Sequence, residues 1–403
     1  MKTKLLMILS AAVLFGACSM KSGDPMDGAG DGMYEPGGTG TESGEGQEYA
    51  GKVTAGEWRD LDNWLFWSDL MNGTIAGQDG QGYASMCDYW GFYTNNRVAV
   101  RVTNEAGQPQ RDVLVQLLQY VEEIPDVICE GRTDNKGEVN LFVGLTYKID
   151  EVDASRMVIG LNGNIPIVSA EPPMITHWGE EVKWNPLMIS QEASKNIDIA
   201  FIVDATGSMS DEINFLKADL TDIINKVGEA HADANIRTAA LFYRDEGDDY
   251  LTRVSDFTDD LSVTTNYIAK QKADGGGDYP EAVHTALEVG LQKLSWREDN
   301  SIRLAFMLLD APPHKQDDVL ASLHQSIPQY AKRGIRIIPV AASGVDKNTE
   351  FFLRFTAIAT DGTYVFITNH SGVGGDHIEA TVGAYKVELL NDLMVRLIDQ
   401  YLE

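Results

Sequence analysis

The hydrophobic pattern changes its period along the chain, and each period predicts a different kind of element. From residue 97 apolar residues alternate with polar ones, as at Val98, Val100 and Val102. From residue 196 short unbroken apolar runs are separated by segments with an apolar residue every three or four positions. Alternation predicts half-buried strands, whereas unbroken runs between amphipathic helices predict a buried parallel sheet. We therefore expect a small antiparallel β-sandwich over 94–190 and, over 196–403, an α/β domain with a doubly wound, mostly parallel, Rossmann-like sheet.

Each of these two regions has a definite set of expected elements. In the β-sandwich, strands are expected around 98–102, 113–117 and 139–143, with a hairpin over 157–169. In the α/β domain, strands are expected at 197–203, 236–243, 251–257 (an edge strand), 303–310, 335–341 and 363–367. The helices expected between them are 210–227, 280–294, 317–331, 349–359 and 379–402. Alternation of strand and helix places helices on both faces of the sheet.

A tryptophan-rich segment precedes the sandwich. Over 57–72 the apolar residues recur at helical spacing, and 83–93 is also rich in aromatic residues. This pattern predicts an aromatic helical segment over 56–93. Its aromatic stripe either packs on a neighbouring domain or binds a sugar or a partner.

The amino terminus has the features of an export signal. Lys2 and Lys4 precede an apolar run over 5–15 that is too short to span a bilayer, and Cys18 follows two small residues. The run resembles the lipobox of bacterial lipoproteins, which implies a signal peptide over 1–17 and acylation of Cys18. The Gly-rich, acidic segment 18–55 is expected to be a tether. The expected location is the cell envelope, as an outer-membrane lipoprotein on the periplasmic side or at the surface.

Charge and cysteine content restrict the partners. The chain of 403 residues carries a formal net charge of −29, which opposes binding to nucleic acid. Besides Cys18 the chain has Cys87 and Cys129, which could pair in an oxidising compartment or stay free.

Oxygen-bearing side chains follow two of the predicted buried strands. Asp204, Thr206 and Ser208 follow the run that ends at Val203, and Asp310 ends a second run. Because the carboxyl ends of parallel strands lie at one edge of a sheet, these side chains are expected to converge there. A glycine-rich loop over 275–281 is expected nearby. Carboxylate and hydroxyl oxygens suit Mg²⁺, Mn²⁺ or Ca²⁺ rather than zinc or copper.

The order Asp-x-Thr-x-Ser, Gly-Gly-Gly-Asp and strand-Asp resembles the von Willebrand factor type A domain. The resemblance covers about 196–403 and implies a metal-ion-dependent adhesion site in which Asp204, Thr206, Ser208 and Asp310 are ligands. Where that family most often has Thr, this chain has Asp278. A further carboxylate would strengthen cation binding and weaken the pull of the ion on an acidic partner.

The sandwich region has a resemblance of its own. Alternating valines at 98–102 and 113–115, Gly107-x-Pro109 and Thr133-Asp134-x-x-Gly137 are similar to the carboxypeptidase regulatory-like domains of bacterial surface proteins. The resemblance implies a spacer or accessory module without catalytic residues.

Two further residues are candidates for ligand contact at the same sheet edge. His314 lies four residues after Asp310, and could contact a ligand or simply stack on Pro312 or Pro313. Arg244 ends a strand and could form a salt bridge with Asp278 or Asp204. No HExxH, Walker or Gly-x-Ser-x-Gly motif occurs, so no enzyme is expected.

The function expected from these features is binding of a protein or glycan partner through the metal face, in adhesion or assembly of a surface complex. Two alternatives stay open. The metal could only stabilise a structural scaffold, or it could activate water in a hydrolase.

Overall fold

A computed structural model of the chain describes residues 51–73, 83–121, 124–149, 151–162, 164–168, 171–192, 195–277, 279–370 and 372–402. The predicted signal peptide, Cys18 and most of the predicted tether lie outside these residues, as does Asp278. In the part that is described, no helix is both long and apolar enough for a membrane span.

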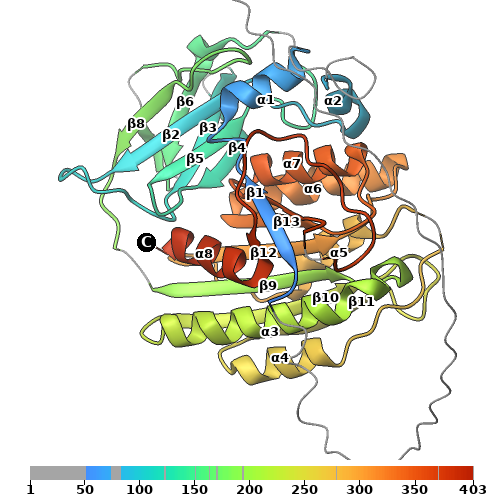
Figure 1. Ribbon diagram of the computed structural model, residues 1–403. Helices are drawn as coiled ribbons and strands as arrows, with labels where there is room; N and C mark the ends of the chain where they lie inside the picture. The colour runs from blue at the N-terminus through green and yellow to red at the C-terminus, as the bar shows by residue number, and fades with distance from the viewer. Residues whose placement is uncertain are drawn as a thin grey trace, which may run out of the picture. The chain divides into compact units, whose positions relative to one another are not determined.

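The central element is a twisted, mostly parallel sheet with the order β11-β10-β9-β12-β13-β14-β1-β15 (Figure 1). Neighbouring strands from β10 to β14 run parallel, whereas β11 and β1 run antiparallel to their neighbours. This confirms the expected α/β class, and the expected edge strand is β11. The strands are β1 (Thr54–Trp58), β9 (Asn196–Asp204), β10 (Asn235–Tyr243), β11 (Thr252–Thr258), β12 (Ile302–Leu309), β13 (Ile335–Ala341), β14 (Tyr364–Ile367) and β15 (Glu388–Leu389).

Helices cover both faces of this sheet because its central strands are apolar on both sides. One core joins the sheet to α5 (Val283–Lys293), α6 (Asp317–Lys332) and α7 (Lys347–Ala359), together with α1 (Trp64–Met71) and α2 (Ser85–Trp90). The other core joins it to α3 (Ile213–Ala230), α4 (Leu261–Ala269) and α8 (Leu390–Leu402). The sheet is therefore doubly wound.

The position of strand β1 shows that the expected order of domains was wrong. We expected one helix over 57–72, but Thr54–Trp58 is a strand that pairs with β14 and β15, more than 300 residues later in the chain. Only Trp64–Met71 is helical in that segment. Buried Asp60, just after β1, forms a two-bonded ion pair with buried Arg354 of α7, at 2.6 and 2.9 Å. The residues before the sandwich therefore belong to the α/β domain, and the sandwich is inserted between β1 and β9.

The inserted region consists of two small sheets around a shared apolar core. One sheet has the order β5-β2-β8 and the other β4-β3-β6-β7. The strands are β2 (Arg97–Thr103), β3 (Leu114–Val121), β4 (Ile124–Arg132), β5 (Glu138–Phe142), β6 (Met157–Leu161), β7 (Asn164–Val168) and β8 (Trp184–Met188), with a short 3₁₀ turn, η1 (Ala154–Arg156). The two sheets agree only loosely with the expected antiparallel sandwich. The difference is that β2 and β8 are parallel.

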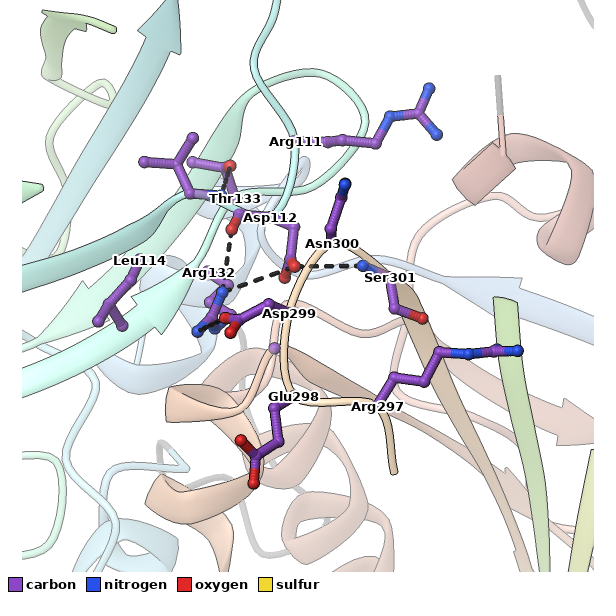
Figure 2. A network of polar contacts seen from close by, with 12 residues as sticks. Arg111, Asp112, Leu114, Arg132, Thr133, Arg297, Glu298, Asp299, Asn300 and Ser301 are labelled. Carbon is purple, nitrogen blue, oxygen red and sulfur yellow. Dashed lines mark hydrogen bonds and ion pairs between the residues drawn. The ribbon is translucent and has the colours of Figure 1, made fainter. Parts of the chain in front are cut away.

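Polar contacts attach the insertion to the end of the α/β sheet where β12 and β13 begin (Figure 2). The Asp112 carboxylate accepts hydrogen bonds from Arg303, the second residue of β12, and from the main chain of Ser301. Arg132 pairs with Asp299 at 2.8 Å, and Asp361 accepts hydrogen bonds from Asn140. This end of the sheet is opposite to the end where β9 and β12 finish.

Smaller differences concern helix limits and cysteines. Helix α4 was not expected, and the final helix begins at Leu390 rather than at 379. Helix α5 begins at Val283, three residues after Pro280. Cys87 and Cys129 are both free, so the disulfide considered above is not formed.

Candidate functional site

The site is built around the last residue of β9. Asp204 is fully buried, and its Oδ1 accepts hydrogen bonds from the main-chain N–H of Thr206 (2.9 Å) and from the Thr206 hydroxyl (2.7 Å). The hydroxyls of Thr206 and Ser208 are 3.1 Å apart. The 3₁₀ turn η2 (Gly207–Asp211) then leads into α3. The alternation of Asp204, Thr206 and Ser208 thus brings their oxygens to one place.

Asp310 reaches the same place from the neighbouring strand. Leu308 of β12 is in register with Val203 of β9, so Asp310 follows the end of β12 beside the loop that carries Thr206. Burial raises the pKa of the Asp310 carboxyl, and the Ser208 hydroxyl opposes this rise. The structure therefore brings together Asp204, Thr206, Ser208 and Asp310.

The glycine-rich loop packs directly on this arrangement. The main-chain N–H of Gly207 donates to the carbonyl of Gly275 at 3.0 Å, and a Cβ on Gly207 would lie 2.7 Å from that oxygen. Gly276 has a φ of +73°, and its N–H donates to both oxygens of Asp248. Glycine is required here because the two backbones approach so closely.

Glu281, in the same loop, is a site residue that the sequence analysis did not identify. It is 2% exposed, and Asp204, Asp245 and Asp310 are among the charges that act on it. Its main-chain N–H donates to the carbonyl of Pro312, which fixes it beside the loop that follows Asp310. Its position at the end of the Gly-Gly-Gly-Asp-Tyr-Pro-Glu run was the sequence feature that could have indicated a place in the site.

Buried like charges dominate the electrostatics of the site. Burial, with the charge of Asp310 second, raises the pKa of Asp204. Burial and the surrounding carboxylates raise the pKa of Glu281 to about 9. Burial likewise raises the pKa of the Tyr243 hydroxyl, which faces Asp204. Without a counter-charge, these carboxylates destabilise one another.

Several oxygen atoms that could contribute to a divalent-cation site lie at this edge of the sheet. Asp204 Oδ2, Asp310 Oδ1 and Glu281 Oε2 are buried and have no hydrogen-bond partner among the described residues. Buried polar atoms are normally bonded, so these oxygens are candidates for contact with a bound ion. Among the described residues no three His, Cys, Asp or Glu side chains are grouped so as to hold a metal ion. An ion here would therefore need the hydroxyls of Thr206 and Ser208 in addition to the carboxylates.

The two candidate ligand-contact residues have other partners. Arg244 is buried and donates to the carbonyls of Ala205 and Lys272, each at 3.0 Å, so it supports two loops of the site and forms no salt bridge with Asp204. The Nε2 atom of His314 is 2.7 Å from Asp245 Oδ1. These contacts correct the expectation of a salt bridge between Arg244 and Asp204.

His377 is a buried residue to which the sequence analysis assigned no role. Its side chain is 1% exposed and bonds to Glu212 Oε1 at 2.8 Å and to Asn369 Oδ1 at 2.9 Å. Glu212 is near the start of α3 and also accepts a hydrogen bond from the main chain of Ser343. These bonds tie the glycine-rich loop 369–377 to the elements around Asp310.

Comparison with known proteins agrees with this geometry. Residues 198–372 match the family model of the von Willebrand factor A domain. The chain is 26% identical over 234 residues to the alpha-protein kinase vwkA of Dictyostelium discoideum, a region that covers 55% of this chain and 36% of the kinase. It is 32% identical over 122 residues to a putative ariadne-like RING finger protein, R811, of Acanthamoeba polyphaga mimivirus, covering 30% of this chain and 12% of that protein.

The matched regions are thus about a third and an eighth of the lengths of these two relatives. The chain contains a von Willebrand factor A domain at residues 198–372, which begins at the third residue of β9 and ends shortly after β14.

Proposed function

We propose that this protein binds a protein or glycan partner through the edge of the sheet that carries Asp204 and Asp310. A divalent cation bound there takes part in the interaction. The proposal starts from the von Willebrand factor A domain at residues 198–372. Domains of this type commonly mediate protein interactions or adhesion. A bound Mg²⁺, Mn²⁺ or Ca²⁺ would supply a positive charge and an open coordination position for a partner oxygen. We further propose that the protein acts without catalysis, as a lipoprotein anchored to the envelope through Cys18.

One observation carries the metal part of the proposal. Asp204, Asp310 and Glu281 each have one buried carboxylate oxygen without a partner in the described part of the chain, and the other oxygen of Asp204 bonds to the Thr206 hydroxyl, which is 3.1 Å from that of Ser208. Leaving them unpaired is costly, and a cation would offset that cost. The geometry therefore favours a site that is completed by an ion.

Thermal unfolding of the full chain tests the proposal. A ligand that binds only the folded state stabilises it by about 2.7 kcal/mol at a concentration of one hundred times its Kd. We expect Mg²⁺ or Mn²⁺ to raise the Tm by several degrees and Asp204→Ala to abolish the rise. Glu229→Gln, a change at an exposed acid of α3, should leave the rise intact. Equal melting curves with and without cation would refute the metal site.

Binding of a partner needs a separate measurement. Capture of a specific envelope component by the full chain should be lost with EDTA and with Asp204→Ala. If both treatments lower stability but leave capture unchanged, the cation only stabilises a scaffold.

A further inference from the structure

The loops that surround the candidate metal site have an acidic exposed surface. In the described parts of loops 204–212, 244–251, 272–281, 310–316, 342–346 and 369–377, the exposed acids are Asp211, Glu246, Asp249, Asp274, Asp346 and Asp376. The exposed lysines of the same loops are Lys272 and Lys315. Hydrogen bonds link several of these loops, from Gly207 to Gly275 and from Gly344 to Asp376. The acids therefore form a rim around Asp204 and Asp310, which we call the acidic rim.

The centre of the rim is also negative. Asp204, Asp310 and Glu281 are at most 5% exposed, and each has one oxygen for which the described residues provide no partner. The carboxylates of Asp204 and Asp310 by themselves can neutralise the two positive charges of one divalent ion. The buried cation Arg244 is already bonded to the carbonyls of Ala205 and Lys272. The negative potential of the rim would repel a partner carboxylate, whereas it would attract a partner cation.

Tyr279 provides an aromatic surface at the rim. Its side chain is 43% exposed, but its hydroxyl is held, because it donates to the carbonyl of Gly344 (3.1 Å) and accepts from the N–H of Asp346 (3.0 Å). The guanidinium groups of Arg244 and Arg253 lie over the ring of Tyr250, in loop 244–251, at 4.5 and 3.8 Å. A fixed, exposed ring beside carboxylates is a favourable place for a Lys or Arg side chain.

We propose that the partner bound at this face is a protein segment rich in Lys and Arg, with one of its cations on the ring of Tyr279. This inference rests on the proposed function and specifies the class of partner. Positive side chains at the acidic rim gain Coulomb attraction, and the guanidinium or ammonium group gains a cation–π contact.

Fluorescence anisotropy with two labelled peptides of equal length tests the inference, one rich in Lys and Arg and the other rich in Asp and Glu. With the full chain in Mg²⁺, the basic peptide should bind and the acidic peptide should not. Salt should weaken binding, because the attraction is between exposed charges. Tyr279→Leu should weaken binding of the basic peptide about fivefold, while Tyr279→Phe keeps the ring and most of the affinity.

Matched charge variants separate the rim from the general negative charge of the protein. The triple change Glu246→Gln, Asp249→Asn and Asp376→Asn should weaken binding about tenfold or more. The control, Glu105→Gln, Asp126→Asn and Glu171→Gln, removes the same charge from exposed positions of the insertion and should have little effect. Equal weakening by both triples, or tighter binding of the acidic peptide, would overturn the inference.

The outcome also distinguishes this inference from the proposed function. If Mg²⁺ raises the Tm but the acidic peptide binds better, the metal site stands and the class of partner is wrong. If Mg²⁺ has no effect but the rim triple still weakens basic-peptide binding, the class of partner stands and the metal site is wrong.

Discussion

Asp112 of the insertion and Arg303 of the α/β sheet form a buried ion pair in which the two guanidinium nitrogens donate to the two carboxylate oxygens at 2.8 and 3.2 Å. The two residues are 5% and 0% exposed. Asp112 has a φ of 55° and also accepts a hydrogen bond from the main chain of Ser301, which lies beside it in Figure 2. The pair therefore attaches the insertion to the start of β12.

Removing one member of this pair should be strongly destabilising. We expect Asp112→Asn to lower the free energy of unfolding by about 3 kcal/mol, because Arg303 is left buried without a counter-charge. Asparagine tolerates the left-handed φ, so the backbone should not be disturbed. Urea denaturation measures the change, and the double variant with Arg303→Met should cost less than the sum of the single changes. The matched control is Asp233→Asn, which breaks the exposed pair with Lys195 and should have no measurable effect. Additive costs would show that the two side chains are not coupled.

A fragment that starts at Lys195 should not fold stably by itself. It contains the matched residues 198–372, but it lacks β1, the strand that β14 and β15 pair with, and it lacks Asp60, the partner of buried Arg354. Its exposed strand edge should promote association. We expect size-exclusion chromatography and circular dichroism to show aggregation or loss of cooperative unfolding, in contrast to a fragment over 51–403. A monomeric fragment with the Tm of the longer one would contradict this.

Without bound metal, the protein should have a higher free energy of unfolding when the charge of Asp204 is removed. We expect Asp204→Asn to raise the free energy of unfolding in EDTA by about 1–2 kcal/mol, because it removes one of several buried like charges. The same variant should lose the stabilisation by Mg²⁺. Urea titrations with and without Mg²⁺ give both values. Lower stability of the variant in EDTA would mean that the Asp204 carboxylate is compensated within the protein.

Asp219 should make stability depend on pH. It is fully buried in α3 beside the N–H of Gly51, and burial raises its pKa from 3.8 to about 7. A raised folded-state pKa means that the folded state keeps a proton that the unfolded state releases. Its stabilising contribution is therefore present below about pH 4 and is lost as the pH rises to about 7.

The variant Asp219→Asn should remove this dependence and be more stable than the natural chain at pH 8, by about 2–4 kcal/mol. Its amide oxygen can still accept the bond from Gly51. Chemical denaturation between pH 5 and pH 8 checks the slope, with Glu229→Gln as the control on the same helix. If the free energy of unfolding changes equally with pH in Asp219→Asn and in the natural chain, Asp219 is not the source of the pH dependence.

His377 should hold the loop that ends beside Asp310. His377→Ala removes bonds to Glu212 and Asn369, and a buried Glu212 without this partner costs about 1–3 kcal/mol. We expect faster hydrogen exchange over 369–377, measured by mass spectrometry. His370→Ala, at an exposed position of the same loop, should leave the exchange of the other residues unchanged. Unchanged exchange in both variants would show that other contacts hold the loop.

The α/β sheet, most of its strands and the proximity of four residues of the candidate site could be predicted from the amino-acid sequence. Asp204 and Asp310 end two unbroken apolar runs, and parallel strands bring such ends to one edge, so local pattern and one rule of topology were sufficient. The same holds for Thr206 and Ser208, which are close to Asp204 along the chain.

Which other distant groups meet could not be predicted, because it depends on long-range packing. Strand β1 has five residues without a clear period, and its pairing with β14 depends on main-chain hydrogen bonds across more than 300 residues. Glu281 enters the site because close backbone packing at Gly207 and Gly275 sets the course of its loop. His377 and Arg303 are buried only because Glu212 and Asp112 lie opposite them. Hydrophobic period reports which side of an element is buried, but the partners of strand edges and buried charges are set by long-range packing.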